Sequence, residues 1–143
     1  MTTSDALGAN ARQAMVDIFR KKDATVVDRY FGESFIQHDP TLADGLAGMK
    51  SFAAEVASSP AADITIYRTL VDGDFVLLHS RYQGVGRYAG PAIAFDLFRF
   101  KDGKIVEHWS DRSQRRLLIC QAARKSTAPP RSLIVKRRRP IGR

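Results

Sequence analysis

The chain has few of the residues that build cross-linked or membrane-spanning structures. Its single cysteine, Cys120, excludes an internal disulfide framework and a zinc site made of several thiolates. No apolar run approaches the roughly 20 residues that a transmembrane helix needs. Residues 1–16 lack the basic and apolar regions of a signal peptide. We therefore expect a cytoplasmic protein that has no membrane partner.

Acidic residues are scarce near the C-terminus. Residues 110–143 hold 11 Lys and Arg and one acid, Asp111, whereas residues 1–109 hold 12 basic and 14 acidic residues. The net charge of +8 therefore belongs to the basic segment. This segment has no aromatic residue and cannot stack on nucleic-acid bases. We interpret residues 1–120 as one domain and residues 121–143 as a basic extension, either solvated or bound to nucleic acid.

Hydrophobic periodicity predicts helices first and strands afterwards. Helical spacing covers residues 4–22, a short segment from Asp23 that Gly32 would end, and residues 46–57. An extended segment is expected at residues 35–40, and period-two strands at 64–71, 75–83 and on both sides of Asp102-Gly103. This order predicts an α+β fold with helices on one face of a curved antiparallel sheet.

The sequence from residue 94 to residue 110 predicts a β-hairpin. One face of this hairpin would carry two carboxylates beside aromatic rings. Asp102-Gly103 suits a two-residue type I′ turn, since both positions need a positive φ. A regular register then pairs Asp96 with Trp109, and places His108 on the opposite face as a surface or interface histidine. The predicted common face holds Ala94, Asp96, Phe98, Phe100, Ile105, Glu107 and Trp109.

Asp96 and His38 are the candidate catalytic residues. In an apolar pocket the pKa of Asp96 would rise, which suits proton transfer near neutral pH. The alternative is a structural carboxylate paired with Arg81 or Arg99. His38 ends an extended segment and can polarise a carbonyl, or it can be tied to Asp39.

Six further residues are candidates for lining a substrate pocket. Trp109 offers apolar area as a wall. His79 shares a strand face with Arg81, so the two either orient a base or lie on a solvated surface. The candidate lining residues are Trp109, Tyr30, His79, Tyr82, Phe98 and Glu107. The three histidines lack metal-ligand spacing, so we predict no metal.

Two motifs carry a resemblance to a known family. The segment FIQHDPTLADG (residues 35–45) and the segment DLFRFKDGKIVEHW (residues 96–109) resemble the SnoaL-like polyketide cyclases of the NTF2-like superfamily. The resemblance covers about residues 11–109. It implies a cone of three helices over a strongly bent antiparallel sheet that encloses a pocket. It also implies a homodimer through the sheet, and an acid–base carboxylate that needs no metal and no cofactor.

The resemblance stops abruptly after Trp109. The family pattern there is E-H-W-D, whereas this chain has Ser110, with Asp111 one position later. Either Asp111 is not the family's carboxylate or a bulge restores its direction. Because arginine becomes frequent at the same point, residues 110–143 are a candidate for a replaced or frame-shifted C-terminus.

Three functions follow from these observations. The first is a cofactor-free acid–base enzyme, an aldol-type cyclase or isomerase acting on a small carbonyl compound. Asp96 would be its base and His38 its polarising group. The second is a non-catalytic domain that binds a small ligand or a partner in the same pocket, since one fold hosts many functions. The third is a nucleic-acid-associated protein that acts through the basic segment.

Overall fold

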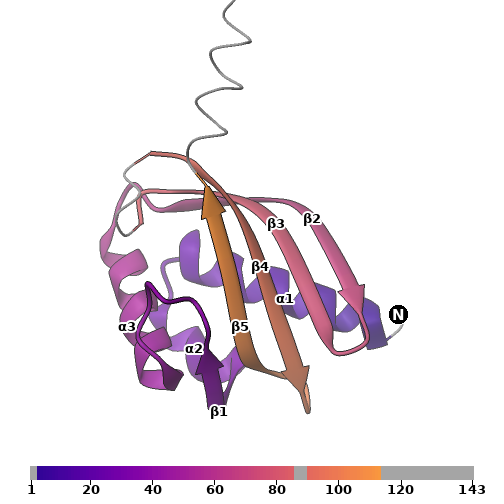
Figure 1. Ribbon diagram of the computed structural model, residues 1–143. Coiled ribbons are helices and arrows are strands. Elements are labelled where there is room, and N and C mark those ends of the chain that lie inside the picture. Colours follow the sequence, from indigo (N-terminus) through magenta and orange to yellow (C-terminus); the bar gives the residue numbers. More distant parts are fainter. Residues whose placement is uncertain (1–2, 86–89, 114–143) are drawn as a thin grey trace, which may run out of the picture.

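The computed structural model describes residues 3–85 and 90–113. Helices and strands follow one another much as the periodicity predicts (Figure 1). The helical elements are α1 (Thr3–Phe19), the 3₁₀ helix η1 (Ala24–Val26), α2 (Val27–Tyr30) and α3 (Gly45–Ser58). The strands are β1 (Phe31–Gln37), β2 (Asp63–Asp72), β3 (Phe75–Gln83), β4 (Ala92–Lys101) and β5 (Lys104–Ser113).

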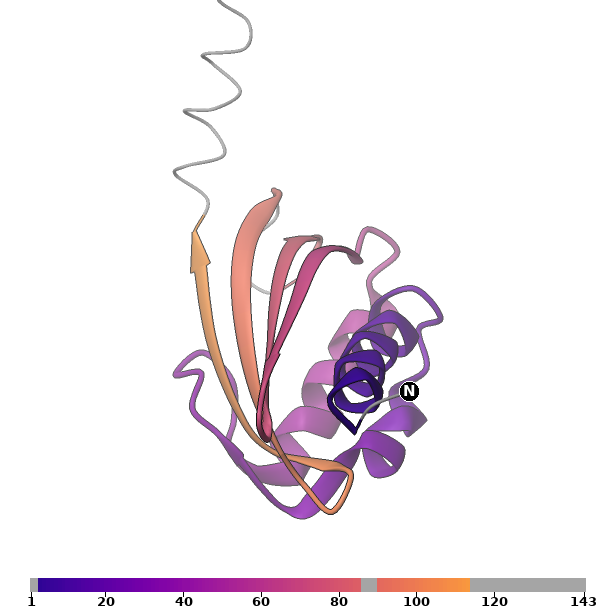
Figure 2. The same ribbon diagram turned by 90° about the vertical axis from the view of Figure 1, so that its right-hand side faces the viewer.

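The five strands form one curved sheet in the order β1-β5-β4-β3-β2. Strand β1 runs parallel to β5, and the other neighbouring strands are antiparallel. Helices α1, α2 and α3 lie on the same side of the sheet, which bends around them (Figure 2). The predicted α+β cone of three helices over a bent sheet is therefore confirmed.

Local sequence explains where several elements begin and turn. The side chain of Asp23 accepts the Thr25 N–H and caps η1, and Asp44 accepts the Gly45 N–H at the start of α3. Asp102 and Gly103 have φ of 50° and 75°, as a type I′ turn requires. Gly32 does not end a helix, because α2 stops at Tyr30 and Gly32 lies within β1.

Strand β5 contains a bulge that changes the predicted hairpin register. Next to the turn, Phe100 pairs with Ile105 as expected, but Arg99 then pairs with Glu107, so Val106 is an extra residue. Every later residue of β5 is displaced by one position relative to β4. The predicted pairing of Asp96 with Trp109 is wrong: Asp96 lies opposite Ser110, and Leu97 lies opposite Trp109.

The displaced register decides which residues face the helices. We call the helix-covered side the inner face and the opposite side the outer face. Because paired residues share a face, His108 joins Phe98 on the inner face and Glu107 joins Arg99 on the outer face. The predicted placement of Glu107 and Trp109 beside Asp96 is therefore wrong, as is that of His108 on the opposite face.

The inner face packs against a continuous apolar core. Residues of α3 that were expected to point inward, such as Phe52 and Val56, are buried there. Phe19 of α1 contacts the rings of Phe52 and Tyr82, with centroid distances of 6.0 and 4.9 Å. This packing joins the helix layer to the C-terminal end of β3.

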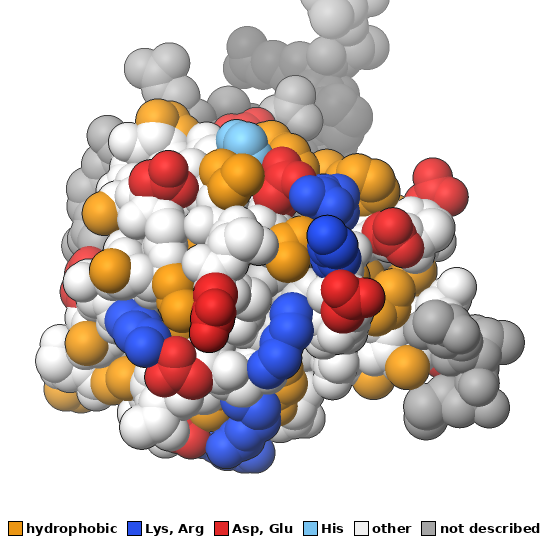
Figure 3. All heavy atoms as spheres, turned by 90° about the horizontal axis from the view of Figure 1, so that it is seen from below, with side chains coloured by type: hydrophobic (Ala, Val, Ile, Leu, Met, Phe, Trp, Pro, Cys, Tyr) orange, Lys and Arg blue, Asp and Glu red, His pale blue; other side chains and the backbone are white. Residues whose placement is uncertain are grey.

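Charge is mixed on one face of the described surface. At the end of the molecule seen from below, acidic and basic side chains are interspersed (Figure 3). The basic segment beyond Ser113, Cys120 and the boundary expected at residue 120 lie outside the described residues. Within the described residues, no helix has the length and apolar character needed to cross a membrane.

Candidate functional site

A chain of hydrogen-bonded polar side chains crosses the inner face from β1 to β3. The carboxylate of Asp96, on β4, is completely buried. Tyr82 donates its hydroxyl proton to Asp96 Oδ2 at 2.6 Å, and His108 Nε2 lies 3.1 Å from Asp96 Oδ1. His108 Nδ1 lies 2.9 Å from Oε1 of Gln37. A buried carboxylate is thus held between a tyrosine and a histidine, with Gln37 as the next member.

The contacts of Gln37 locate a proton on His108. The backbone N–H of Asp39 donates to Gln37 Oε1 at 3.0 Å, so this atom must be the amide oxygen. His108 Nδ1 faces the same oxygen and therefore carries a proton. One further proton then lies between His108 Nε2 and Asp96 Oδ1. When Asp96 is ionised, His108 carries both ring protons and the two residues form a buried ion pair.

The surroundings favour the ionised carboxylate. Burial alone would raise the pKa of Asp96, but hydrogen bonds from His108 and Tyr82 and the charges of His108 and Arg112 hold it below its ordinary value. The expected rise is therefore wrong, because these donors outweigh the apolar surroundings. Burial and the neighbouring carboxylate raise the pKa of Tyr82 well above its ordinary value, so Tyr82 remains a hydrogen-bond donor.

Arg112 and Asp39 form a second ion pair beside this network of hydrogen bonds. Arg112 Nη2 lies 3.1 Å from Asp39 Oδ2, its Nε donates to Ser110 Oγ at 3.2 Å, and its guanidinium lies 5.5 Å from the Tyr82 ring centroid. Ser110 stands where the family pattern has a carboxylate, and it lies opposite Asp96. Asp111 pairs with Phe95 on the outer face and is exposed, so it does not replace that carboxylate.

The ring of Phe98 packs against His108, the histidine of the network. Phe98 is almost fully buried, and its ring stacks on His108 with a centroid distance of 4.7 Å and an interplanar angle of 15°. Asp96, Tyr82 and Phe98 are thus the three sequence-predicted site residues that the structure brings together. Tyr82 and His108 both contact Asp96, and His108 also contacts Phe98.

His38 lies on the other side of the sheet from Asp96. Its Nε2 is 3.0 Å from Glu107 Oε2, and its ring stacks on Trp109 with a centroid distance of 4.4 Å. Arg99 Nε donates to the other oxygen of Glu107 at 2.6 Å. The hydrogen bonds from His38 and Arg99 lower the pKa of Glu107. The structure therefore does not bring the two predicted catalytic residues, Asp96 and His38, to one site.

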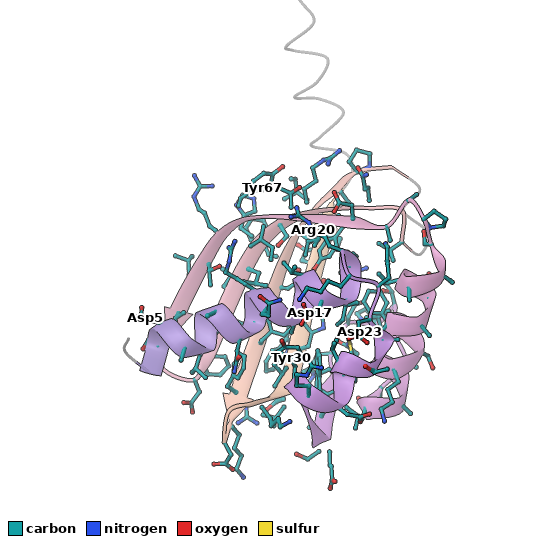
Figure 4. The ribbon with its side chains drawn as sticks, turned by 180° about the vertical axis from the view of Figure 1, so that it is seen from behind. Asp5, Asp17, Arg20, Asp23, Tyr30 and Tyr67 are labelled. Carbon is teal, nitrogen blue, oxygen red and sulfur yellow. The ribbon has the colours of Figure 1, made fainter. Side chains whose placement is uncertain are left out.

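The remaining two predicted lining residues also lie away from Asp96. His79 stacks on Phe95 with a centroid distance of 4.8 Å on the outer face. Tyr30 lies in the helix layer, where its hydroxyl donates to Asp17 Oδ2 at 2.9 Å (Figure 4). Asp17 is buried and also accepts bonds from Gln13 and Lys21. Tyr30 therefore ties α2 to α1.

The described residues also form an open groove at the far edge of the sheet. It has a volume of about 520 Å³ and lies between the N-terminal half of α1 and strand β2. Arg12 crosses it and donates to the Thr69 hydroxyl at 3.0 Å. Asp5 lies at that end of α1, well away from Asp17 and Tyr30 (Figure 4). None of the residues of the Asp96 network lines this groove.

Sequence reasoning missed His108 and Gln37 for different reasons. His108 was assigned to the wrong face because nothing distinguishes Val106 from an ordinary strand residue. For Gln37 a signal was present: Phe35 is buried, and period-two alternation along β1 turns Gln37 inward and His38 outward. The parallel pairing of Gln37 with His108 brings the two side chains together.

Comparison with known proteins agrees with the fold. The family model of the SnoaL-like domain matches residues 13–108, and the chain belongs to this family. No curated protein sequence matches the chain.

Three solved structures illustrate the similarity. An NTF2-like protein of unknown function from Mesorhizobium loti is 20% identical, with a TM-score of 0.65, over 80% of this chain and 96% of that one. A candidate polyketide cyclase from Bacillus cereus is 22% identical (TM-score 0.64; 81% and 78% covered). Another from Acidithiobacillus ferrooxidans is 18% identical (TM-score 0.63; 87% and 98% covered). At these identities the likeness shows the shared NTF2-like fold.

Proposed function

We propose that the chain is a cofactor-free acid–base enzyme that acts on a small carbonyl compound, as an aldol-type cyclase or isomerase. The observation that carries this proposal is the buried Asp96 carboxylate, bonded to both Tyr82 and His108 on the inner face. Membership of the SnoaL-like family and the likeness to candidate polyketide cyclases support it. The histidine in contact with Asp96 is His108 and not His38.

Asp96 has the capacity to accept a proton. A carboxylate offers about four lone-pair sites, and Tyr82 and His108 use two of them. In the proposed reaction a proton leaves the carbon next to the substrate carbonyl and binds Asp96. The C–H electron pair forms the enolate double bond, and the carbonyl π pair moves to oxygen. The enolate carbon then attacks a second carbonyl, and Asp96 returns the proton to the new alkoxide.

Exchange of substrate protons with deuterated water tests the proposal. We expect the wild type to label the α-carbon of at least one member of a panel of small ketones, followed by NMR. Asp96→Asn keeps the size of the side chain but removes the base, so exchange falls by about 10²-fold or more. Asp17→Asn is the matched control, since it alters a buried carboxylate of the helix layer, and it retains wild-type exchange.

Equal exchange by the wild type and Asp96→Asn across the panel overturns the enzymatic proposal. Ligand binding without exchange favours a non-catalytic binding domain instead. A third outcome is nucleic-acid binding whose affinity falls steeply with salt concentration and is lost when residues 124–143 are removed. This outcome favours a nucleic-acid-associated protein that acts through the basic segment.

We also propose that the chain pairs as a homodimer through the outer face of the sheet. The described helices leave this face uncovered (Figure 2), and Phe95, Phe75 and Tyr67 are exposed on or beside it. Phe95→Glu places a charge in the centre of this surface, so sedimentation should show the mass of one chain. Ala54→Glu, on the exposed side of α3, should remain dimeric. A monomeric wild type contradicts the dimer.

A further inference from the structure

Gln37 is the member of the inner-face network that has an unused hydrogen-bond donor. The residue is 8% exposed, and Oε1 already accepts hydrogen bonds from Asp39 N–H and His108 Nδ1–H. Among the described residues, Nε2 of the same amide is buried without a partner. Buried amide N–H groups are nearly always bonded, because leaving them without an acceptor is costly.

The side-chain amide of Gln37 cannot rotate to give Nε2 a hydrogen-bond acceptor. A rotation by 180° would place Nε2 against the Asp39 N–H and His108 Nδ1–H, and would set donors against donors. The directions of the two N–H groups on Nε2 are therefore fixed by the same two contacts that fix the tautomer of His108. A donor held in a fixed direction needs no reorganisation when negative charge develops on an acceptor in front of it.

We propose that Gln37 Nε2 donates a hydrogen bond to the carbonyl oxygen of the substrate and stabilises the negative oxygen of its enolate. This inference rests on the proposed acid–base function and names the electrophilic partner of Asp96. The substrate therefore presents a carbonyl oxygen on the Gln37 side of His108. Its acidic C–H lies on the Asp96 side.

Two other polar side chains fit this role less well. His38 is one residue away but lies on the outer face against Glu107 and Trp109. Ser80 Oγ is also buried without a partner among the described residues, but Ser80 sits on β3 opposite Ala94. A hydroxyl rotates freely and therefore fixes no direction for a ligand.

The first experiment observes the amide directly in the wild-type protein. The probe is acetylacetone, whose enolate carries the negative oxygen that the site would stabilise. In ¹⁵N-labelled protein the side-chain resonances of Gln37 are assigned by their loss in Gln37→Met. We expect titration with acetylacetone to shift these resonances together with those of His108. Shifts at His108 without any shift of the Gln37 amide overturn the role of Gln37 and leave the proposed function standing.

The second experiment separates donation from positioning. Gln37→Glu keeps an oxygen for Asp39 N–H and His108 Nδ1–H but replaces the donor with an acceptor. Gln37→Met removes both. Loss of an oxyanion donor lowers kcat by about 10²–10³-fold, so we expect a loss of this size in α-proton exchange for both variants, with a smaller change in KM. Gln83→Glu, the same substitution at the end of β3, should retain wild-type exchange.

The two variants distinguish the two roles further. Gln37→Met also removes the acceptor of His108 Nδ1–H, so its loss of exchange should be at least as large as that of Gln37→Glu, which keeps this acceptor and lacks only the donor. Wild-type rates in Gln37→Glu overturn the donor role. Failure of the proposed function looks different: Asp96→Asn then exchanges as fast as the wild type, and no inner-face resonance responds to acetylacetone.

Discussion

Two histidine–carboxylate pairs lie on opposite faces of the same sheet and have nearly the same length. His108 and Asp96 are 3.1 Å apart on the inner face, and His38 and Glu107 are 3.0 Å apart on the outer face. Their surroundings differ. The inner side chains are 6% and 1% exposed, and the outer ones are 35% and 17% exposed.

This difference teaches that burial, and not distance, decides what such a pair does. In water, screening and side-chain entropy leave an ion pair with little net stabilisation. In the interior, removing one partner leaves the other as an uncompensated charge. The inner pair is therefore the one whose loss most affects folding and, under our proposal, catalysis. The outer pair positions aromatic rings on a surface.

The largest expected effect comes from breaking the inner pair. Asp96→Ala leaves His108 and Tyr82 without their acceptor, so the free energy of unfolding should fall by about 3–5 kcal/mol. Glu107→Ala removes the outer carboxylate and should cost much less. Urea denaturation followed by circular dichroism measures both. Equal losses for the two variants would contradict the comparison.

A buried carboxylate without a histidine partner gives a smaller effect. Asp17 is buried, but its partners are Gln13, Lys21 and Tyr30. Asp17→Asn should lower the free energy of unfolding by about 1–3 kcal/mol at pH 7.

The sign of the pH dependence of this loss follows from the pKa of Asp17. Burial would raise this pKa, but the bonds from Lys21, Gln13 and Tyr30 lower it. The stabilisation by Asp17 is thus fully present above the unfolded value of about 3.9 and is lost as the pH falls through the folded pKa. Urea denaturation between pH 7 and 3 should show the wild type and Asp17→Asn converging only at the acid end. Convergence above pH 5 would oppose this assignment.

The smallest effect concerns the outer pair alone. Trp109 is the only tryptophan, and His38 stacks on its indole. Removing the imidazole in His38→Ala uncovers the indole, so the emission maximum of Trp109 at pH 7 should move to a longer wavelength. His108→Gln should leave the emission maximum unchanged, because His108 lies on the other face. An unchanged maximum in His38→Ala would contradict a contribution of the stacking to the surroundings of the indole.

Much of the fold could be predicted because its signals are local. Asp102-Gly103 fixed the turn, Asp23 capped a helix, and the buried face of α3 followed from helical spacing. The site could be predicted only in part. Asp96, Tyr82 and Phe98 do share the inner face, but the register beyond Arg99 depends on the bulge.

The rest of the site depends on contacts between distant parts of the chain. The pKa of Asp96 could not be deduced without knowing that His108 and Tyr82 donate to it. The pairing of Gln37 with His108 comes from parallel strands, whose register no turn sets. His38 was predicted as a site residue because imidazole can polarise a carbonyl. The alternation of buried residues from Phe35 onward instead indicates that its neighbour Gln37 faces inward.

The extra residue in β5 also affects how relatives of this chain are compared. Deleting the one codon for Val106 would remove the bulge and leave Arg99 opposite Glu107 and Asp96 opposite Ser110, so the inward residues would stay the same. A strand that kept this residue but paired without a bulge would instead turn Glu107 and Trp109 inward in place of His108 and Ser110. Equivalent residues in this family should therefore be matched from the glutamate–histidine–tryptophan motif, not by counting from the Asp102-Gly103 turn.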